Sequence, residues 1–257
     1  MWALAFAIYC GCKWLTWRRR PDVSAPAWKH VAYLLAWPGL DAAAFLSEEP
    51  RHPVQWDDYF RGIRNVSAGL VLFFGVARFV VARNSYLAAW IGMVGVVLLL
   101  HFGVFELLSC IWRAAGIQAR PLMNKPIHSK SLGEFWGRRW NTAFRDLTHR
   151  FLFRPLTRRL GVPAGLAGGF LFSGLVHDLV ISWPASGGWG GPTVFFTIQG
   201  AGILLERSRL GQRMGLGAGL SGQIFAATLL ILPVPLLFHR PFAEVIILPF
   251  MYASGAL

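Results

Sequence analysis

Apolar segments of nearly membrane-spanning length constrain this chain more than any other feature. Eight such segments lie at about 1–17, 28–46, 66–82, 86–112, 161–183, 192–206, 216–238 and 241–257. A helix needs ~20 apolar residues to cross a bilayer. The chain is 55% hydrophobic and 14% charged, whereas a soluble domain carries ~25% charge. The sequence therefore predicts an all-α, polytopic membrane protein with about 7–8 membrane segments, built as one membrane domain over residues 1–257.

Basic residues predict the orientation of these segments. Residues 113–160 form a basic loop with eleven Lys or Arg against only Glu134 and Asp146, and such loops stay in the cytoplasm. If all eight segments crossed, Arg18–Arg20 would face the other side, so we expect segment 28–46 to be re-entrant or interfacial. Residues 1–17 lack a basic start and a clear cleavage site, which favours a retained first span over a signal peptide. We then expect Met1 and the uncharged 184–191 loop outside, and these basic positions in the cytoplasm: Arg18–Arg20, Arg51, Arg61, Arg64, 113–160, Arg207, Arg209 and Arg213.

A helix is predicted to begin at Ser131, because Ser131 and Glu134 have the spacing of a capping box. An apolar stripe follows at helical spacing, and Pro155 is expected to end or kink the helix. The result is an amphipathic helix on the cytoplasmic face, with tryptophans at headgroup depth. The stripe consists of Trp136, Trp140, Phe144, Leu147 and Phe151, and Arg138, Asn141, Arg145 and Thr148 share another face.

Two interpretations of this polar face stay open. The simpler one is an interfacial anchor whose arginines extend to the headgroups. The other is a substrate site, because Asn141 offers an amide that can position a carbonyl or stabilise an oxyanion beside guanidinium groups.

His177 is the second unusual residue, since it lies in an apolar segment where ionisable groups are costly. Gly165, Gly169, Ser173 and His177 recur every four residues, so small side chains would let a helix or a flat substrate approach. A neutral buried imidazole suits a general base, although an interhelical hydrogen bond is the simpler role. Asp178 points about 100° away, which suits it better to a neighbouring partner than to His177.

Other ionisable residues near the membrane have simpler expected roles. His101 is expected either to contact His177 or to form a hydrogen bond across helices. Glu106 and Glu206 are expected to pair with arginines. We find no nucleophile elbow, P-loop, metal-ligand motif or nucleic-acid-binding signature, so direct attack by an acceptor is favoured over a covalent intermediate.

Residues 131–141 (SLGEFWGRRWN) and 173–177 (SGLVH) resemble the wax-synthase branch of the membrane-bound O-acyltransferases. The resemblance covers about 30–250 and includes Tyr33–Asp41, Pro121–Met123, Phe153–Leu156, Pro241-Phe242 and Leu248–Phe250. It implies that Asn141 and His177 are the catalytic pair, and that an acyl group moves from acyl-CoA to the hydroxyl of a lipophilic alcohol. Two departures are the short chain, which could alter the acceptor entrance, and Asp178, where glutamate is expected.

These observations give a working hypothesis. Lys130, Arg138, Arg139 and Arg145 bind the CoA phosphates, Trp136 and Trp140 contact the substrate, and no metal or cofactor is needed beyond acyl-CoA as cosubstrate. The protein would be integral to a membrane, the cytoplasmic membrane if it is bacterial. The competing hypotheses are a non-enzymatic transporter or lipid-binding protein and an inactive homologue. The sequence leaves the alcohol, the acyl length and the oligomeric state open.

Overall fold

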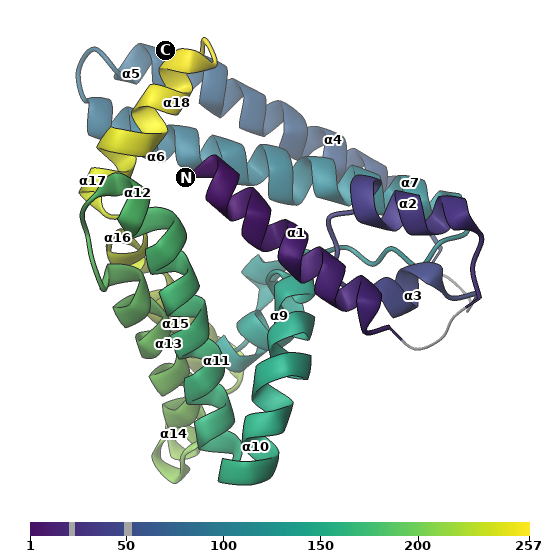
Figure 1. Cartoon of the computed structure of the whole chain (residues 1–257). Coiled ribbons are helices and arrows are strands. Elements are labelled where there is room, and N and C mark those ends of the chain that lie inside the picture. Colours follow the sequence, from purple (N-terminus) through teal and green to yellow (C-terminus); the bar gives the residue numbers. More distant parts are fainter. Residues whose placement is uncertain (21–23, 49–52) are drawn as a thin grey trace. The chain divides into compact units, whose positions relative to one another are not determined.

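A computed structural model describes residues 1–20, 24–48 and 53–257, and all regular secondary structure in these ranges is helical (Figure 1). The chain divides into two compact units. The first comprises Asn124–Ile246, and the second comprises Trp2–Met123 together with Ile247–Leu257. Because Arg51 lies outside the described residues, the structure bears only on the other positions used for the topology.

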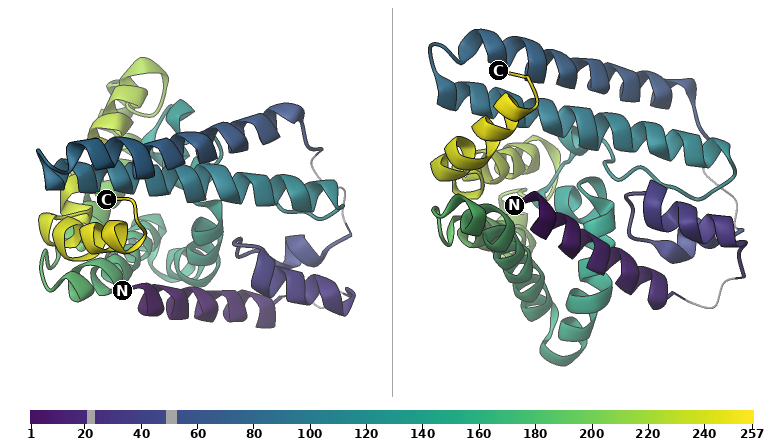
Figure 2. Two further views of the ribbon diagram at one scale, coloured as in Figure 1. Left: turned by 90° about the horizontal axis from the view of Figure 1, so that it is seen from above. Right: turned by 45° about the horizontal axis from the view of Figure 1, so that its top comes forward.

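Two long helices of the second unit form an antiparallel hairpin (Figures 1 and 2). The first covers Trp56–Val80 and the second covers Ser85–Ala114, and both are long and apolar enough to span a membrane. Asn84 starts the second by accepting the Leu87 N–H at 2.9 Å. A Cβ added at Gly69 would lie 2.6 Å from the Leu99 nitrogen, so the glycine allows the backbones to approach. The hairpin contains α4 (Trp56–Leu70), η1 (Val71–Val76), α5 (Ala77–Val80), α6 (Ser85–Val96), η2 (Val97–Val104) and α7 (Phe105–Ala114).

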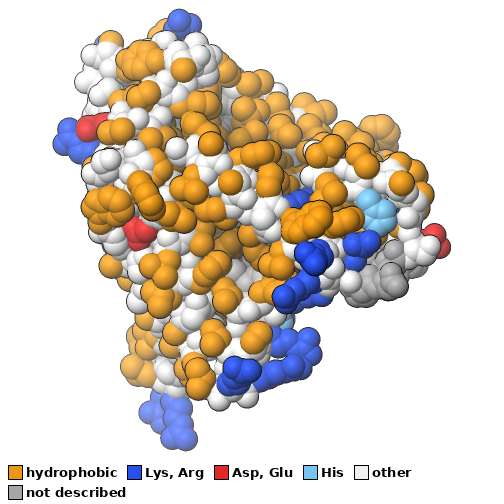
Figure 3. Space-filling model, in the orientation of Figure 1, with side chains coloured by type: hydrophobic (Ala, Val, Ile, Leu, Met, Phe, Trp, Pro, Cys, Tyr) orange, Lys and Arg blue, Asp and Glu red, His pale blue; other side chains and the backbone are white. Residues whose placement is uncertain are grey.

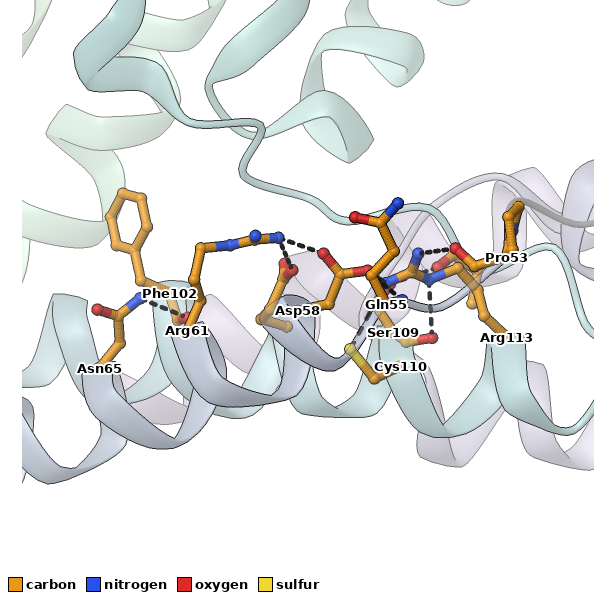
Figure 4. Close-up of polar contacts among 11 residues, drawn as sticks. Pro53, Gln55, Asp58, Arg61, Asn65, Phe102, Ser109, Cys110 and Arg113 are labelled. Carbon is orange, nitrogen blue, oxygen red and sulfur yellow. Dashed lines mark hydrogen bonds and ion pairs between the residues drawn. The ribbon is translucent and has the colours of Figure 1, made fainter.

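Charged side chains at one end of this hairpin neutralise one another (Figure 4). Asp58 accepts from Arg61 and from Arg113, the latter at 3.1 Å. Arg61 also reaches Glu106 at 3.3 Å, which confirms that Glu106 pairs with an arginine. Two carboxylates facing two guanidiniums offset the cost of burying each charge alone. His101, on the same hairpin, packs on the Phe105 ring at 5.4 Å.

Segment 28–46 does not form one helix. It consists of α2 (Ala27–Ala36) and α3 (Ala42–Leu46), which are separated by residues 37–41. Lys13 of α1 (Trp2–Arg18) donates to the carbonyls of Trp37 at 2.6 Å and Gly39 at 2.5 Å, so these two carbonyls of the interruption have a donor. The predicted break is confirmed, and neither helix is long enough to cross a bilayer. The C-terminal helix α18 (Leu248–Ala253) completes this unit.

The first unit packs several helices around one apolar core. Leu132, Ile203 and Ala226 are its most buried members, with Trp136 and Phe170 packed against them. The neighbouring helices α11 and α13 lie side by side (Figure 1). The elements are η3 (Pro126–His128), α8 (Leu132–Glu134), η4 (Phe135–Arg139), α9 (Thr142–Thr148), η5 (His149–Phe153), α10 (Arg154–Leu160), α11 (Val162–His177), η6 (Asp178–Ser182), α12 (Trp183–Ala185), α13 (Gly191–Arg207), α14 (Arg209–Arg213), α15 (Gly219–Ile231), α16 (Val234–Leu237), α17 (Arg240–Phe242) and η7 (Ala243–Ile247).

Four helices of the described residues are long and apolar enough to cross a membrane, fewer than the predicted 7–8 segments. Besides the hairpin helices, they are Val162–Ala185 and Gly219–Leu237. The remaining apolar segments are shorter or broken. Segments 1–17 and 192–206 correspond to helices of 17 residues, and segment 241–257 begins within a helix that ends at Ala253. The multi-pass helical architecture is confirmed, and the larger count is not reached on length and composition.

Candidate functional site

The helix predicted to begin at Ser131 does begin there. Ser131 Oγ accepts the Glu134 N–H at 3.0 Å, and Glu134 accepts the Lys130 N–H at 2.7 Å. The reciprocal bond of the capping box therefore falls one residue earlier than in the standard motif. Because Glu134 accepts the Lys130 N–H and pairs with Arg139, its pKa lies below its usual value.

The predicted single amphipathic helix is wrong at Asn141. The first helix ends at Arg139, and Asn141 has φ of 40° and ψ of 62°, in the left-handed region. Asn141 then starts α9 by accepting the Phe144 N–H at 3.2 Å. Asparagine tolerates left-handed backbone and is a favoured N-cap, so it can both turn the chain and start a helix. Arg138 and Arg145 consequently lie on different helices and do not share one face with Asn141.

The second helix does not end at Pro155. It runs from Thr142 to Leu160 and includes a wider π-helical turn over His149–Phe153, directly before Arg154-Pro155. Proline removes one backbone donor and crowds the carbonyl four residues earlier, and a wider turn relieves that conflict. The helix is therefore distorted and continues to Gly161, where the chain turns into α11.

Trp136 and His177 meet the same aromatic ring. The Phe196 ring of α13 lies 4.5 Å from the His177 ring and 5.6 Å from the Trp136 ring, between centroids. Trp136 also packs edge-on against Phe170 of α11 at 5.8 Å. Trp136 is thus partly buried against the apolar core, whereas Trp140 stacks on Phe135 at 5.4 Å. The 131–141 motif and the 173–177 segment therefore both contact α13, and Phe196 is the residue that they share.

His177 is oriented by its own helix. Its Nδ1 lies 2.7 Å from the Ser173 carbonyl oxygen. Because a carbonyl only accepts, Nδ1 carries the proton and Nε2 of the neutral ring is the basic nitrogen. In the stripe leading to His177, a Cβ on Gly165 would lie 2.1 Å from Thr157 Oγ1, but one on Gly169 would meet no atom within 4 Å. Gly165 therefore allows α10 to pack closely against α11, whereas the space beside Gly169 is open.

Asp178 organises the chain next to His177 without contacting its ring. Its carboxylate accepts from Ser182 Oγ at 2.8 Å, Gly190 N at 2.9 Å, Thr193 N at 3.1 Å and Thr193 Oγ1 at 2.5 Å. The prediction that Asp178 serves a neighbouring element is confirmed. All four partners are donors, so the carboxylate ties the end of α11 to the start of α13.

Ser182, Asp178 and His239 form a cluster that resembles a hydrolytic triad in composition only. His239 Nδ1 accepts the Phe242 N–H at 3.2 Å, so its proton is on Nε2, which donates to Ser182 Oγ at 3.2 Å. Ser182 in turn donates to Asp178. The Ser182 hydroxyl therefore donates its hydrogen bond to the carboxylate and not to the histidine. The histidine does not activate the serine as a nucleophile, and the cluster is a structural clamp.

The four predicted phosphate-binding cations have different surroundings. Arg139 is engaged by Glu134 at 2.6 Å and by the carbonyls of Asn124 and Lys125, so it clasps the loop before the motif. Arg145 pairs with Asp146 at 2.7 Å. Arg138 and Lys130 have exposed side chains. Arg138 and Lys130 are therefore the better placed of the four to meet an anion from solution.

Two further residues of α13 were missed or misread in the sequence. Gln199 is fully buried and accepts the Trp136 Nε1–H at 3.2 Å. Glu206 was expected to pair with an arginine, but it accepts the backbone N–H of Leu132 at 2.7 Å and of Gly133 at 3.3 Å. A carboxylate at a helix N-terminus satisfies backbone donors that lack a partner within the helix.

The surface of this unit separates apolar and basic regions. Hydrophobic side chains are spread widely over the face in Figure 3, and Lys and Arg gather toward the lower ends of α10 and α14. Within the described ranges, no group of three His, Cys, Asp or Glu side chains could hold a metal ion.

Comparisons with known proteins agree with the motifs. The sequence model of the membrane bound O-acyl transferase family matches residues 119–198. A probable long-chain-alcohol O-fatty-acyltransferase 1 from Arabidopsis thaliana is 28% identical over 172 residues, which cover 60% of this chain and 48% of that protein. A long-chain-alcohol O-fatty-acyltransferase from Simmondsia chinensis is 28% identical over 107 residues, 35% of this chain and 28% of that protein. An acyl-CoA–sterol O-acyltransferase 1 from Arabidopsis thaliana is 30% identical over 71 residues, 25% of this chain and 21% of that protein. The aligned part spans less than half the length of each relative.

Proposed function

We propose, from the premise that this chain belongs to the membrane-bound O-acyltransferase superfamily in its wax-synthase-like branch, that it transfers an acyl group from acyl-CoA to the hydroxyl of a lipophilic alcohol. The observation that carries the proposal is the orientation of His177. Its Nδ1–H is engaged by Ser173, so Nε2 is the nitrogen that takes a proton. The relatives are named for long-chain alcohols and sterols, which suggests the class of acceptor.

The proposed reaction is a direct transfer. The alcohol oxygen attacks the thioester carbonyl carbon while His177 Nε2 removes the hydroxyl proton. The carbon–sulfur bond then breaks, and the proton on the imidazolium passes to the CoA thiolate, which leaves as the thiol. A neutral ester remains in the membrane, and His177 returns to its neutral form.

Asn141 is proposed to act on the acyl carbonyl. Its Oδ1 accepts the Phe144 N–H, so Nδ2 is the donor that its amide offers to an oxyanion. Removing one such donor typically lowers the rate ~10²–10³-fold. The left-handed backbone at Asn141 holds the amide at the end of one helix and the start of the next. Lys130 and Arg138 are proposed to bind the CoA phosphates.

Ester formation tests the proposal directly. The purified protein is incubated with acyl-CoAs of graded chain length and with a panel of fatty, sterol and terpenoid alcohols, and the products are identified by mass. We expect an ester that contains both components, together with one CoA thiol per ester. Binding of either substrate without thiol release across the whole panel would favour a lipid-binding protein or transporter.

The membrane orientation is a separate part of the proposal. We propose seven crossings: α1, the four long helices, α13, and the helix of residues 240–253. At 1.5 Å per residue the 17-residue helices α1 and α13 are ~25 Å long, close to the ~30 Å hydrocarbon thickness. Residues 113–160 and α14 would then face the cytoplasm.

Labelling with a membrane-impermeant maleimide in a cysteine-free background tests this orientation. Trp189→Cys and Leu210→Cys introduce the thiol at exposed positions beyond the two ends of α13, Trp189 before its first residue and Leu210 after its last. We expect Trp189→Cys to be labelled on intact cells and Leu210→Cys only after permeabilisation. The reverse pattern would refute the orientation.

A further inference from the structure

One face of α13 contacts both halves of the proposed site. Thr193, Phe196, Gln199 and Glu206 are spaced by 3, 3 and 7 residues, so they share one side of the helix. Thr193 holds Asp178, and Phe196 contacts His177 and Trp136. Gln199 and Glu206 bind the segment that ends at Asn141. The helix is therefore a common support for His177 and for the 131–141 motif.

Both polar atoms of the Gln199 amide have a partner. Its Oε1 accepts from Trp136, and its Nε2 donates to the Leu229 carbonyl at 2.8 Å. Leu229 lies four residues before Pro233, which has no N–H to close the helical bond to that carbonyl. In a membrane environment such a freed carbonyl needs another donor. Gln199 meets this need and thereby links Trp136 to α15.

Glu206 fixes the other end of the motif helix. It is 7% exposed, and its Oε2 accepts two N–H groups from the first turn. Ser131 satisfies a third through the Glu134 N–H. The motif helix is thus attached to α13 at its first turn by Glu206 and one turn later by Gln199. Two attachments on one rigid helix define both the position and the rotation of the motif.

We propose that Gln199 and Glu206 are positioning residues for acyl transfer: they fix the 131–141 motif on α13 and so set Asn141 relative to His177. The inference rests on the proposed function. Neither side chain needs to touch substrate, and each acts through the backbone or the indole of the motif. A displacement of about 1 Å at a reacting group can lower a rate ~10²-fold.

The kinetic test separates positioning from substrate binding. Gln199→Leu removes both hydrogen bonds of Gln199, and Glu206→Leu removes the oxygen that accepts the Leu132 and Gly133 N–H groups. Trp136→Phe removes the indole N–H and keeps a smaller aromatic ring. We expect Gln199→Leu and Glu206→Leu to lower kcat about 10- to 100-fold with little change in KM for acyl-CoA. Trp136→Phe should lower kcat by less, and adding it to Gln199→Leu should cause no further loss, because both remove the same bond.

The matched controls make similar substitutions at positions away from the 131–141 motif. Thr197→Val replaces a polar side chain on the exposed side of α13. Glu244→Leu makes the same change at a carboxylate that pairs with Arg240 at the surface. Both should retain kcat within twofold. The inference is overturned if folded Gln199→Leu and Glu206→Leu also keep kcat within twofold, or if their loss lies wholly in KM.

Failure of the proposed function can be distinguished from failure of the positioning role. If the wild-type protein forms no ester with any alcohol, the function is refuted, and the attachment of the motif to α13 is tested instead by the rate of amide hydrogen exchange at residues 131–136. Glu206→Leu should then speed exchange of the Leu132 and Gly133 amides, and Glu244→Leu should not. Unchanged protection of both amides in Glu206→Leu would overturn the positioning as well.

Discussion

Asp178→Asn tests whether the carboxylate beside His177 holds α11 to the start of α13. The carboxylate accepts four hydrogen bonds, two at each oxygen. An asparagine keeps one accepting oxygen and places an NH₂ group opposite the donors of the other. Two bonds to a charged group are lost, at about 1.5 kcal/mol each. The free energy of unfolding should therefore fall by about 3 kcal/mol.

Thermal unfolding in detergent measures this loss. For a chain of this size each kcal/mol corresponds to a shift of ~2–4 °C, so Asp178→Asn should melt ~6–12 °C below wild type. Asp146→Asn is the matched control, because Asp146 is 41% exposed and pairs with a partly exposed Arg145. Such a pair contributes ~0–1 kcal/mol. A midpoint for Asp178→Asn within about 2 °C of wild type would refute the clamp.

Three further outcomes follow from the same geometry. Asn141→Asp keeps the oxygen that caps α9 but replaces the NH₂ donor with an acceptor, so ester formation by the folded variant should fall ~10²-fold or more; retained activity would remove the amide from the mechanism. Because the pKa of Glu134 is depressed in the folded protein, its contribution to stability is present above the ordinary glutamate pKa of ~4.3 and is lost as pH falls through the folded value; the melting midpoint of wild type should therefore drop more steeply below pH ~4 than that of Glu134→Gln, and parallel curves would contradict this. Gly174→Ala should cost ~1–3 kcal/mol in thermal unfolding, because its Cβ would lie 2.6 Å from the Thr193 Cα, whereas Gly169→Ala should be neutral or stabilising; equal effects would mean that α11 and α13 are not closely packed.

Local features of the site were readable from the sequence because they depend on neighbouring residues. The Ser131 cap, the interruption at Trp37 and the direction of Asp178 away from His177 each follow from spacing within a few positions. The turn at Asn141 was missed because aromatic residues continue at helical spacing across it. Asparagine before threonine was the available signal, since asparagine is a strong N-cap.

Contacts between distant segments could not be read in this way. Glu206 binds a backbone 74 residues earlier, and Gln199 binds an indole 63 residues earlier. From the nearby sequence alone, Glu206 is expected to pair with an arginine, because Arg207 and Arg209 follow it. Backbone donors reach it only because α13 packs on α8. Pro233 did carry a usable signal, because a proline inside an apolar helix frees a carbonyl that some buried donor must meet.

The most direct test of the account is CoA thiol release by purified wild type and His177→Ala with a long-chain acyl-CoA and a long-chain alcohol. His128→Ala provides a matched control, because His128 is an exposed histidine of the same unit. The account predicts alcohol-dependent thiol release in wild type and His128→Ala, and none above background in His177→Ala. Release by folded His177→Ala at the wild-type rate would contradict it.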